Sequence, residues 1–255
     1  MTATRAALAA RLAAEGFVAA EEEAGELLAR AAGDEALLEA LVARRLTGEP
    51  LAWITGTTRF CGLDVRVDPG VYVPRWHTEA LAERAAARLP GDGTGVDLCT
   101  GSGALALVLA ARRPRARVLA ADLDPRAVAC ARANGVEALR GDLFAPLPAG
   151  LRGAVDVVVA VVPFVPTGEL RLLQRDTFAF EDRLAYDGGS DGARLLRRVA
   201  REAPDWLRPG GALLLELGGG QAALLAAELA AAGFTEVATV HDEEGDPRGV
   251  EATVG

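Results

Sequence analysis

The chain of 255 residues contains no lysine, so its 27 basic side chains are all arginines. This absence excludes a lysine in a phosphate-binding loop and a lysine Schiff base. Histidine is scarce too, because only His77 and His241 occur, and a histidine-rich metal centre is therefore excluded. The three cysteines, Cys61, Cys99 and Cys130, lack paired spacing. That pattern predicts no disulfide framework and no metal site, and it favours the cytoplasm.

Long apolar runs are also missing from the sequence. We expect neither a membrane span nor a secretion signal, because no apolar stretch is long enough to cross a bilayer. Acidic side chains exceed basic ones by 36 to 27, a formal net charge of −9, which disfavours nucleic acid as a partner. The length and the 51% content of hydrophobic residues suit one sizeable α/β domain with a small appendage.

The most informative stretch of the chain ends at Asp122. It predicts a buried strand over 96–98, a glycine turn over 100–103, a helix over 104–112 and a second strand that ends at Asp122. Gly101 and Gly103 lack the side chains that keep a ligand off the backbone, and the helix that follows points free N–H groups at the turn. An acidic residue about twenty positions after such a turn is placed to bind a ribose. The stretch therefore predicts a nucleotide-type site.

Strands and helices alternate from residue 94 onward, which predicts a doubly wound α/β sheet with its ligand at the carboxyl ends of the strands. Residues 1–47 are expected to form a small helical domain, with Asp34 as an N-cap. Residues 48–75 are expected to form a β-hairpin linker, with strands over 60–63 and 65–73 and a Pro69-Gly70 turn. The remaining domain spans 76–255; within it, Thr78 is expected to cap a helix over 79–89, and a further helix is predicted over 194–206.

Three carboxylates are expected around the pocket. Asp97 lies in the strand before the glycine turn, where it can meet an ammonium group, Asp122 can take ribose hydroxyls, and Asp142 can accept from an adenine amino group beside the Leu143 N–H. Such a pocket suits a cationic, phosphate-free ligand better than a pyrophosphate. The glycine spacing also fits a nicotinamide-dependent oxidoreductase, and Asp97 and Asp142 are alternatively capping residues.

Several successive motifs resemble those of class I S-adenosylmethionine-dependent methyltransferases: DLCTGSGALALVLA, AADLDPRAVACARAN, GDLF and VVAVVPFVP. Upstream RRLTGEPLAWITGTTRFCGLDVRVDPGVYVPRWHTE and downstream LRPGGALLLELGGGQA narrow the resemblance to the protein-(glutamine-N5) methyltransferases that modify release factors, in an actinobacterial branch. The resemblance implies a seven-stranded Rossmann-like sheet and S-adenosylmethionine as the methyl donor, which leaves as S-adenosylhomocysteine. It covers residues from about 40 to the C-terminus.

The resemblance also assigns the cofactor residues. Asp97, Gly101 and Gly103 hold the methionine end, Asp122 the ribose, and Asp142 with Leu143 the adenine. The predicted cofactor site further includes three neighbours of these positions, Cys99, Thr100 and Leu123.

The acceptor motif departs from the family. Where the family has Asn-Pro-Pro-Tyr, whose asparagine side chain and following carbonyl hold the planar nitrogen of the substrate, this chain has Val161, Val162, Pro163 and Phe164. A valine cannot accept an amide N–H, and an unpaired buried N–H costs about 1–3 kcal/mol. The sequence therefore predicts a different acceptor, a protein or a small planar molecule. The alternative is a non-catalytic paralogue that binds S-adenosylmethionine and works as an interaction module.

Other candidate residues surround this motif. The family's Pro-Arg-Pro-Glu-Thr-Glu is Pro-Arg-Trp-His-Thr-Glu in residues 74–79, which makes His77 and Glu79 near-site candidates, with Glu181 a third by analogy. Their alternative is capping or packing. Segment 168–186 is expected over the substrate mouth, where Phe178, Phe180 and Tyr186 either pack the lid or stack on substrate. The N-terminal helices are either a packing bundle or a docking site for a protein substrate.

Overall fold

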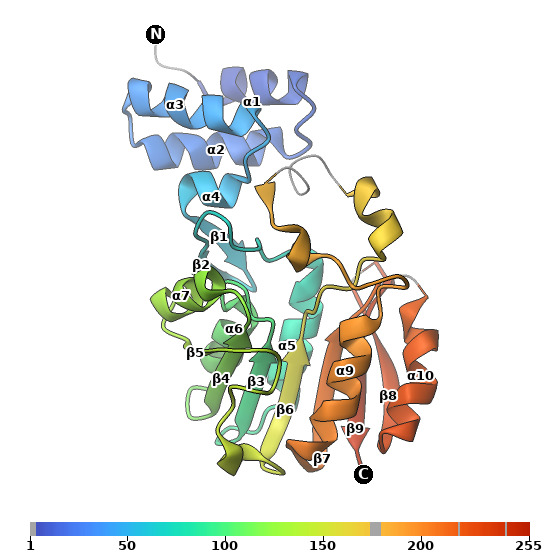
Figure 1. Ribbon diagram of the computed structural model, residues 1–255. Helices are drawn as coiled ribbons and strands as arrows, with labels where there is room; N and C mark the ends of the chain where they lie inside the picture. The colour runs from blue at the N-terminus through green and yellow to red at the C-terminus, as the bar shows by residue number, and fades with distance from the viewer. Residues whose placement is uncertain (1–3, 174–179, 219, 243) are drawn as a thin grey trace.

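The structure, a computed structural model, describes residues 4–173, 180–218, 220–242 and 244–255. Its central layer is a seven-stranded sheet in the order β5-β4-β3-β6-β7-β9-β8 (Figure 1). The first five of these strands are parallel, and β9 runs antiparallel to both β7 and β8. The strands are β3 (Thr94–Leu98), β4 (Arg117–Asp122), β5 (Glu137–Arg140), β6 (Val155–Ala160), β7 (Leu207–Glu216), β8 (Phe234–His241) and β9 (Pro247–Val254). The predicted doubly wound seven-stranded sheet is confirmed.

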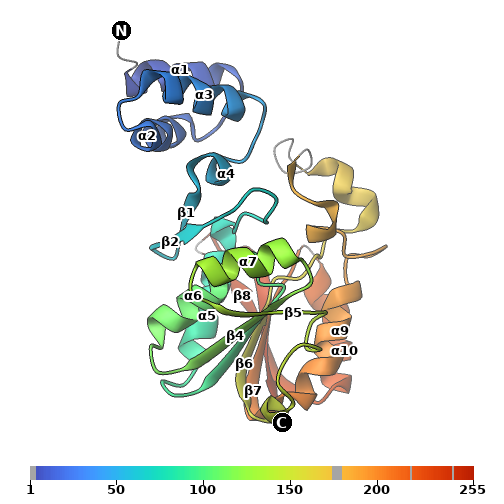
Figure 2. The ribbon, with the colours of Figure 1, turned by 60° about the vertical axis from the view of Figure 1, so that its left-hand side comes forward.

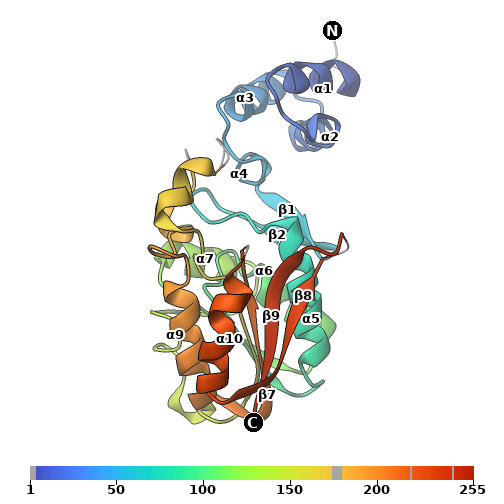
Figure 3. The same ribbon diagram turned by 90° about the vertical axis from the view of Figure 1, so that its right-hand side faces the viewer.

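Helices cover both faces of this sheet, as the view in Figure 3 makes plain. One face carries α5 (Glu79–Arg88), α6 (Ala104–Arg112) and α7 (Pro125–Ala133), and the other carries α9 (Arg194–Glu202) and α10 (Gln221–Ala231). Strands buried on both faces need apolar residues at every position. The run of valines in β6 meets that need, because its side chains enter the apolar cores on the two faces alternately.

The strand order reverses between β3 and β6, which are neighbours in the sheet although β4 and β5 come between them in the chain. Connections from β3 and β6 therefore leave the sheet in opposite directions, and a crevice opens at their carboxyl ends. The loop after β3 and the loop after β6 meet at this crevice. It is the place where a doubly wound sheet binds its ligand.

Three further helices form a unit at the same end of the molecule as the crevice, and α4 joins it to the rest (Figure 2). They are α1 (Arg5–Ala14), α2 (Ala20–Ala31) and α3 (Glu35–Leu46), and they share an apolar core centred on Leu12, Leu27 and Leu41. The expected N-cap at Asp34 is confirmed, because its carboxylate accepts from the Leu37 N–H at 3.0 Å. No helix in the described ranges is both long and apolar enough to span a bilayer.

The segment expected to be only a hairpin differs from that expectation. A short helix, α4 (Leu51–Thr55), follows Pro50 and precedes the hairpin. The strands of the hairpin are β1 (Thr57–Phe60) and β2 (Leu63–Arg66), shorter and earlier than predicted. Cys61 and Gly62 make the turn with φ of 47° and 76°, the left-handed pair that a two-residue hairpin requires.

The Pro69-Gly70 turn exists but does not join the two strands. The Val71 N–H donates to Asp68 O at 3.1 Å and Gly70 has a φ of 84°, so the turn redirects the chain after β2 toward the crevice. Two other expectations were also wrong. Thr78 occupies the N-cap position of α5 without a side-chain capping bond, and α9 ends at Glu202 because Pro204 has no N–H to continue it.

The helical unit contains a buried ion pair that offers a test of its stability. Arg45 and Glu23 are 5% and 8% exposed, and the guanidinium donates to the two carboxylate oxygens at 2.7 and 2.9 Å. Arg45→Ala leaves the Glu23 carboxylate buried and unpaired, so we expect a loss of about 3–5 kcal/mol in the free energy of unfolding. Arg11→Ala, in the exposed pair with Glu39, is the matched control and should cost under about 1 kcal/mol in urea denaturation. Equal losses would contradict this interpretation.

Candidate functional site

A cavity of about 1070 Å³ occupies the crevice at the carboxyl ends of the strands. Its walls come from the chain after β2, the loops after β3, β4, β5 and β6, and the segment that leads into α9. The cavity is larger than the roughly 300–1,000 Å³ of an ordinary ligand pocket, so it has room for two reactants. The main lining ranges are 70–72, 75–77, 121–127, 141–143, 161–165 and 184–187, with Cys99 and Gly101.

The turn after β3 is held in a left-handed conformation. Cys99, Gly101 and Gly103 have φ of 56°, 56° and 85°, and a left-handed cysteine is uncommon outside functional loops. Two carboxylates hold the turn from opposite sides. Asp97 accepts from the Thr100 hydroxyl at 2.5 Å and from the Ala106 N–H at 3.1 Å, and Asp122 accepts from the Gly101 N–H at 2.9 Å.

Asp97 therefore lies behind the turn rather than in the cavity. It is 1% exposed and is not a lining residue, contrary to the expectation that its carboxylate faces an ammonium group. Burial raises the pKa of this carboxyl to about 7. The reason for the difference is geometric, because Asp97 points to the α6 face of the sheet and the first turn of α6 covers it.

Gly103 does not line the cavity either. A Cβ at this position would lie 3.0 Å from the Ala131 side chain and 3.0 Å from Val136, so the glycine allows α6 to approach the loop and helix beside it. Thr100 lines a small separate hollow beneath the turn, together with Gly101 and Thr78. The turn thus exposes only Cys99 and Gly101 to the main cavity.

Asp122 forms the wall of the cavity at the end of β4. One carboxylate oxygen accepts from the Gly101 N–H and the other from the Asp124 N–H, each at 2.9 Å, and burial raises the pKa of this carboxyl. Leu123 follows it into the cavity and is exposed. The thiol of Cys99 also lines the cavity, but burial and the neighbouring Asp122 carboxylate raise its pKa, so it stays protonated and is a poor nucleophile.

Asp142 and Leu143 line the adjacent wall after β5. Leu143 has a φ of 49°, and within the part of the chain that the structure describes its N–H has no hydrogen-bond partner. An unpaired N–H beside a carboxylate matches the acceptor and donor of an adenine edge. Arg198 of α9 also reaches Asp142, with its Nη1 at 3.1 and 3.0 Å from the two carboxylate oxygens.

The expected acidic character of the pocket needs correction. Four arginines line the same cavity as Asp122 and Asp142 and offset much of their charge. Spacing in the sequence could not reveal Arg194 and Arg198, because α9 lies more than fifty residues after Asp142 in the chain. The charged lining residues are Asp122, Asp124, Asp142, Asp182, Asp187, Arg75, Arg126, Arg194 and Arg198.

The four residues of the altered acceptor motif all line the cavity directly after β6: Val161, Val162, Pro163 and Phe164. The Phe164 carbonyl accepts from the Gln221 side-chain amide at 2.8 Å, and a Cβ at Gly218 would lie 3.2 Å from the Phe164 ring. The ring is therefore packed on the glycine and fixed in place. This wall presents apolar side chains to the reactants.

Described residues of the expected lid, among them Asp182, Leu184 and Tyr186, also line the cavity. Buried Glu181 accepts from the Val73 N–H at 2.8 Å and binds both Arg75 and the Tyr186 hydroxyl, while Phe180 packs edge-on against Trp53 at 6.4 Å between ring centroids. These contacts favour lid packing over substrate stacking for Phe180 and Tyr186. Phe178 lies outside the described residues.

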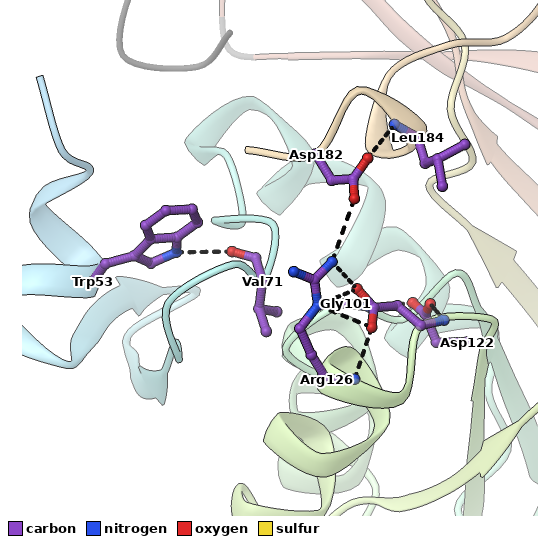
Figure 4. A network of polar contacts seen from close by, with 8 residues as sticks. Trp53, Val71, Gly101, Asp122, Arg126, Asp182 and Leu184 are labelled. Atoms are coloured by element: carbon purple, nitrogen blue, oxygen red, sulfur yellow. Dashed lines mark hydrogen bonds and ion pairs between the residues drawn. The ribbon is translucent and has the colours of Figure 1, made fainter. Parts of the chain in front are cut away.

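A second contact of the lid crosses the mouth of the cavity. Arg126 binds the Asp124 carboxylate, which also caps α7, and reaches Asp182 at 3.4 Å (Figure 4). Trp53 donates its indole N–H to Val71 O at 2.9 Å in the same view. The first turn of α7 and the lid are thereby joined beside Asp122.

Among the three candidates named by analogy, only His77 lines the cavity. Glu79 instead accepts from the Cys61 N–H at 3.0 Å and fixes the hairpin turn, and Glu181 holds the lid.

Sequence reasoning missed Tyr72, Arg75 and Arg126 as lining residues. The Pro-Arg pair at 74–75 could have indicated that Arg75 belongs to the site, whereas no local pattern indicates this for Tyr72 or Arg126. Within the described ranges, no cluster of three or more histidine, cysteine or acidic side chains could hold a metal ion.

The residues around this cavity fit S-adenosylmethionine. Asp122 presents a carboxylate at the end of β4, Leu143 presents an N–H and an apolar surface after β5, and Gly101 lets a ligand approach the backbone. Comparison with known proteins supports this conclusion. The family described as Methyltransferase small domain matches residues 63–171. A methyltransferase from Pyrococcus furiosus has the same fold, with a TM-score of 0.55 at 19% identity over 76% of this chain and 90% of that one.

Closer relatives are release factor glutamine methyltransferases. The protein of Mycolicibacterium smegmatis is 42% identical over 225 residues, which cover 86% of this chain and 79% of the relative. That of Geobacter sulfurreducens is 39% identical over 221 residues, 84% and 75% of the two chains. That of Cereibacter sphaeroides is 36% identical over 267 positions, 95% and 94%.

Fold, cavity and relatives together define an S-adenosylmethionine-dependent methyltransferase, as the sequence motifs predicted. More narrowly, the chain belongs to the release factor glutamine methyltransferase family. This membership favours a methyltransferase over a nicotinamide-dependent oxidoreductase.

The raised pKa of Asp97 makes a prediction about stability. Below about pH 4 the carboxyl is protonated in both the folded and the unfolded chain. Between there and about pH 7 only the folded chain keeps the proton, so the free energy of unfolding should fall with rising pH, by at most about 1.4 kcal/mol per unit. Asp97→Asn removes this dependence while its amide oxygen still accepts from Thr100. The stability gained by the variant should therefore grow from pH 4 to 7 in urea titrations. A pH-independent difference would contradict the assignment.

Proposed function

We propose that this enzyme transfers the methyl group of S-adenosylmethionine to an acceptor other than the glutamine amide of a release factor and releases S-adenosylhomocysteine. The observation that carries the proposal is the apolar wall of Val161, Val162 and Phe164 in the cavity. The relatives are named for glutamine methylation, and the Asn-Pro-Pro-Tyr motif that the family uses to hold an amide is absent here. The acceptor is a planar group that an apolar wall can orient.

We assign the cofactor residues as follows. Asp122 takes the ribose hydroxyls, Asp142 and Leu143 the adenine, and Gly101 the methionine end; Cys99 and Leu123 contact the ligand from the side. Thr100 acts indirectly, because it lines the hollow beneath the turn and donates to Asp97. Asp97 and Gly103 act indirectly, because one holds the turn and the other lets α6 pack against it. When bound, the cofactor supplies an electrophilic methyl group, and the enzyme contributes mainly by positioning the acceptor in line with it.

The geometry of the molecule suits a protein acceptor, and so does its family. The unit α1–α3 has its own apolar core and stands at the end of the molecule where the cavity opens (Figure 2). Val18, between α1 and α2, is fully exposed there. We propose that this unit docks a protein substrate whose side chain enters the cavity past the lid.

The cofactor assignment predicts the effect of one carboxylate. Asp122→Ala removes the group that meets the ribose and releases the Gly101 N–H, so calorimetric affinity for S-adenosylmethionine should fall by at least about tenfold, the value of one charged hydrogen bond. Asp205→Ala, an exposed carboxylate paired with Arg152 on the far side of the sheet, is the matched control and should bind normally. Unchanged binding in Asp122→Ala would contradict the assignment.

The acceptor proposal predicts a gain of function. The unaltered enzyme should incorporate no label from methyl-tritiated S-adenosylmethionine into a release factor, because Val161 offers no partner for the amide N–H. Val161→Asn combined with Val162→Pro restores that partner and should produce labelling at glutamine. The conservative pair Val161→Ile with Val162→Ile is the control. Labelling of the release factor by the unaltered enzyme, at a rate that the double variant does not exceed, would overturn the proposal.

A further inference from the structure

One carboxylate beside the cavity is buried at the end of β7. Glu216 is the last residue of β7 and is 1% exposed, and neither of its carboxylate oxygens has a hydrogen-bond partner among the residues that the structure describes. Burying a charge without partners is costly, so such a group requires an explanation. The imidazole of His77 lies beside it, with Nε2 at 3.5 Å from Glu216 Oε1.

The sheet register places this carboxylate next to the acceptor motif. Val159 pairs with Leu214 and Ala160 with Leu215 in the parallel ladder of β6 and β7, so Glu216 is the next residue along, level with Val161. Neighbouring strands are about 4.8 Å apart. Both residues lie on the α5 face of the sheet. Val161 packs there against the apolar cluster, and His77 lies in the turn that leads into α5.

His77 connects the buried carboxylate to the reactants. Its ring lines the main cavity together with Val161 and Phe164, and its side chain is 30% exposed. The turn Trp76–Thr78 fixes its backbone directly before α5. The family motif has a glutamate where this chain has His77. The chain therefore differs from the family at two neighbouring places in the site: Val161 stands where the family has an asparagine amide, and the His77 imidazole stands where it has a carboxylate.

We propose that His77 accepts the proton that the acceptor loses on methylation, and that Glu216 holds the imidazole in the tautomer with hydrogen on Nε2. This inference rests on the proposed function, because it concerns the same methyl transfer. His77 is the proton acceptor, and Glu216, which acts only through His77, is a positioning residue. The 3.5 Å separation is longer than a hydrogen bond, so the proposed role requires it to shorten in the complex with the reactants.

The proton and electrons balance in this step. The acceptor lone pair forms a bond to the methyl carbon while the carbon–sulfur bond breaks, and its electrons remain on the sulfur of S-adenosylhomocysteine. The acceptor's N–H or O–H proton passes to His77 Nδ1, the nitrogen that does not face Glu216. His77 becomes an imidazolium beside a carboxylate and later returns the proton to water. The acceptor must therefore carry a proton, which defines its class.

The first test needs no acceptor. The chain has only two histidines, and exposed His241 at the end of β8 serves as the internal reference in long-range proton–nitrogen NMR spectra of the imidazoles. We expect neutral His77 to be the Nε2–H tautomer in the unaltered protein and in Glu216→Gln, which keeps an oxygen acceptor. Glu216→Leu should lower the population of this tautomer to that of the exposed reference, His241. An Nδ1–H tautomer in the unaltered protein, or no change in Glu216→Leu, would overturn the role of Glu216.

The second test uses two small planar probes of the same size. Phenol loses a proton when it is methylated, whereas pyridine does not, and the cavity admits both. His77→Gln should slow methyl transfer to phenol by at least about 100-fold, the lower range for a general base, and leave transfer to pyridine within about twofold. His241→Gln is the control and should change neither rate.

The outcomes separate the two proposals. Equal slowing of both probes by His77→Gln, or no slowing with phenol, would overturn the assignment of His77. Transfer to pyridine but not to phenol by the unaltered enzyme would overturn it too. Transfer to neither probe would instead count against the proposed methyl transfer. Calorimetric binding of S-adenosylmethionine, unchanged within about twofold in His77→Gln, establishes that the variant retains its fold and its cofactor site.

Discussion

The clamp on the turn after β3 is the constraint on which the rest of the site depends. Asp97 holds the turn from behind through Thr100 and Ala106, and Asp122 holds it from the front through Gly101. Left-handed backbone at a cysteine is unfavourable, and it persists only when surrounding bonds fix it. Because the clamp ties β3, β4 and the first turn of α6 together, it sets the distance between the cofactor walls before any ligand arrives.

The two ends of the cavity are built differently. The proposed cofactor end combines backbone N–H groups and carboxylates. The acceptor end is apolar after β6 and contains the His77 imidazole, which lies 3.5 Å from the buried carboxylate of Glu216. Arginines from the chain before α5, from α7 and from α9 offset much of the charge of the aspartates in the cavity. Its selectivity therefore rests on shape and on a few directed groups rather than on net charge.

Much of this architecture could be predicted from the sequence. The alternation of apolar strands with helices, the bounds of α6 and the position of Asp122 all follow from local patterns, which are strong where glycine, proline and apolar periodicity coincide. Local patterns failed where distant segments decide the outcome. The hairpin formed at Cys61-Gly62 instead of Pro69-Gly70, and the Thr78 hydroxyl turned inward instead of capping α5. Arg198, Glu216 and the covered position of Asp97 depend on tertiary packing, and no spacing in the sequence marks them.

The most direct measurement of the central claim is a crystal structure with S-adenosylhomocysteine bound. We expect the ribose on the Asp122 carboxylate, the adenine against Leu143, and the sulfur facing the wall of Val161 and Phe164, with His77 on the same side. A ligand whose sulfur faces away from that wall, or one that binds outside the cavity, would contradict the assignment of both ends of the site.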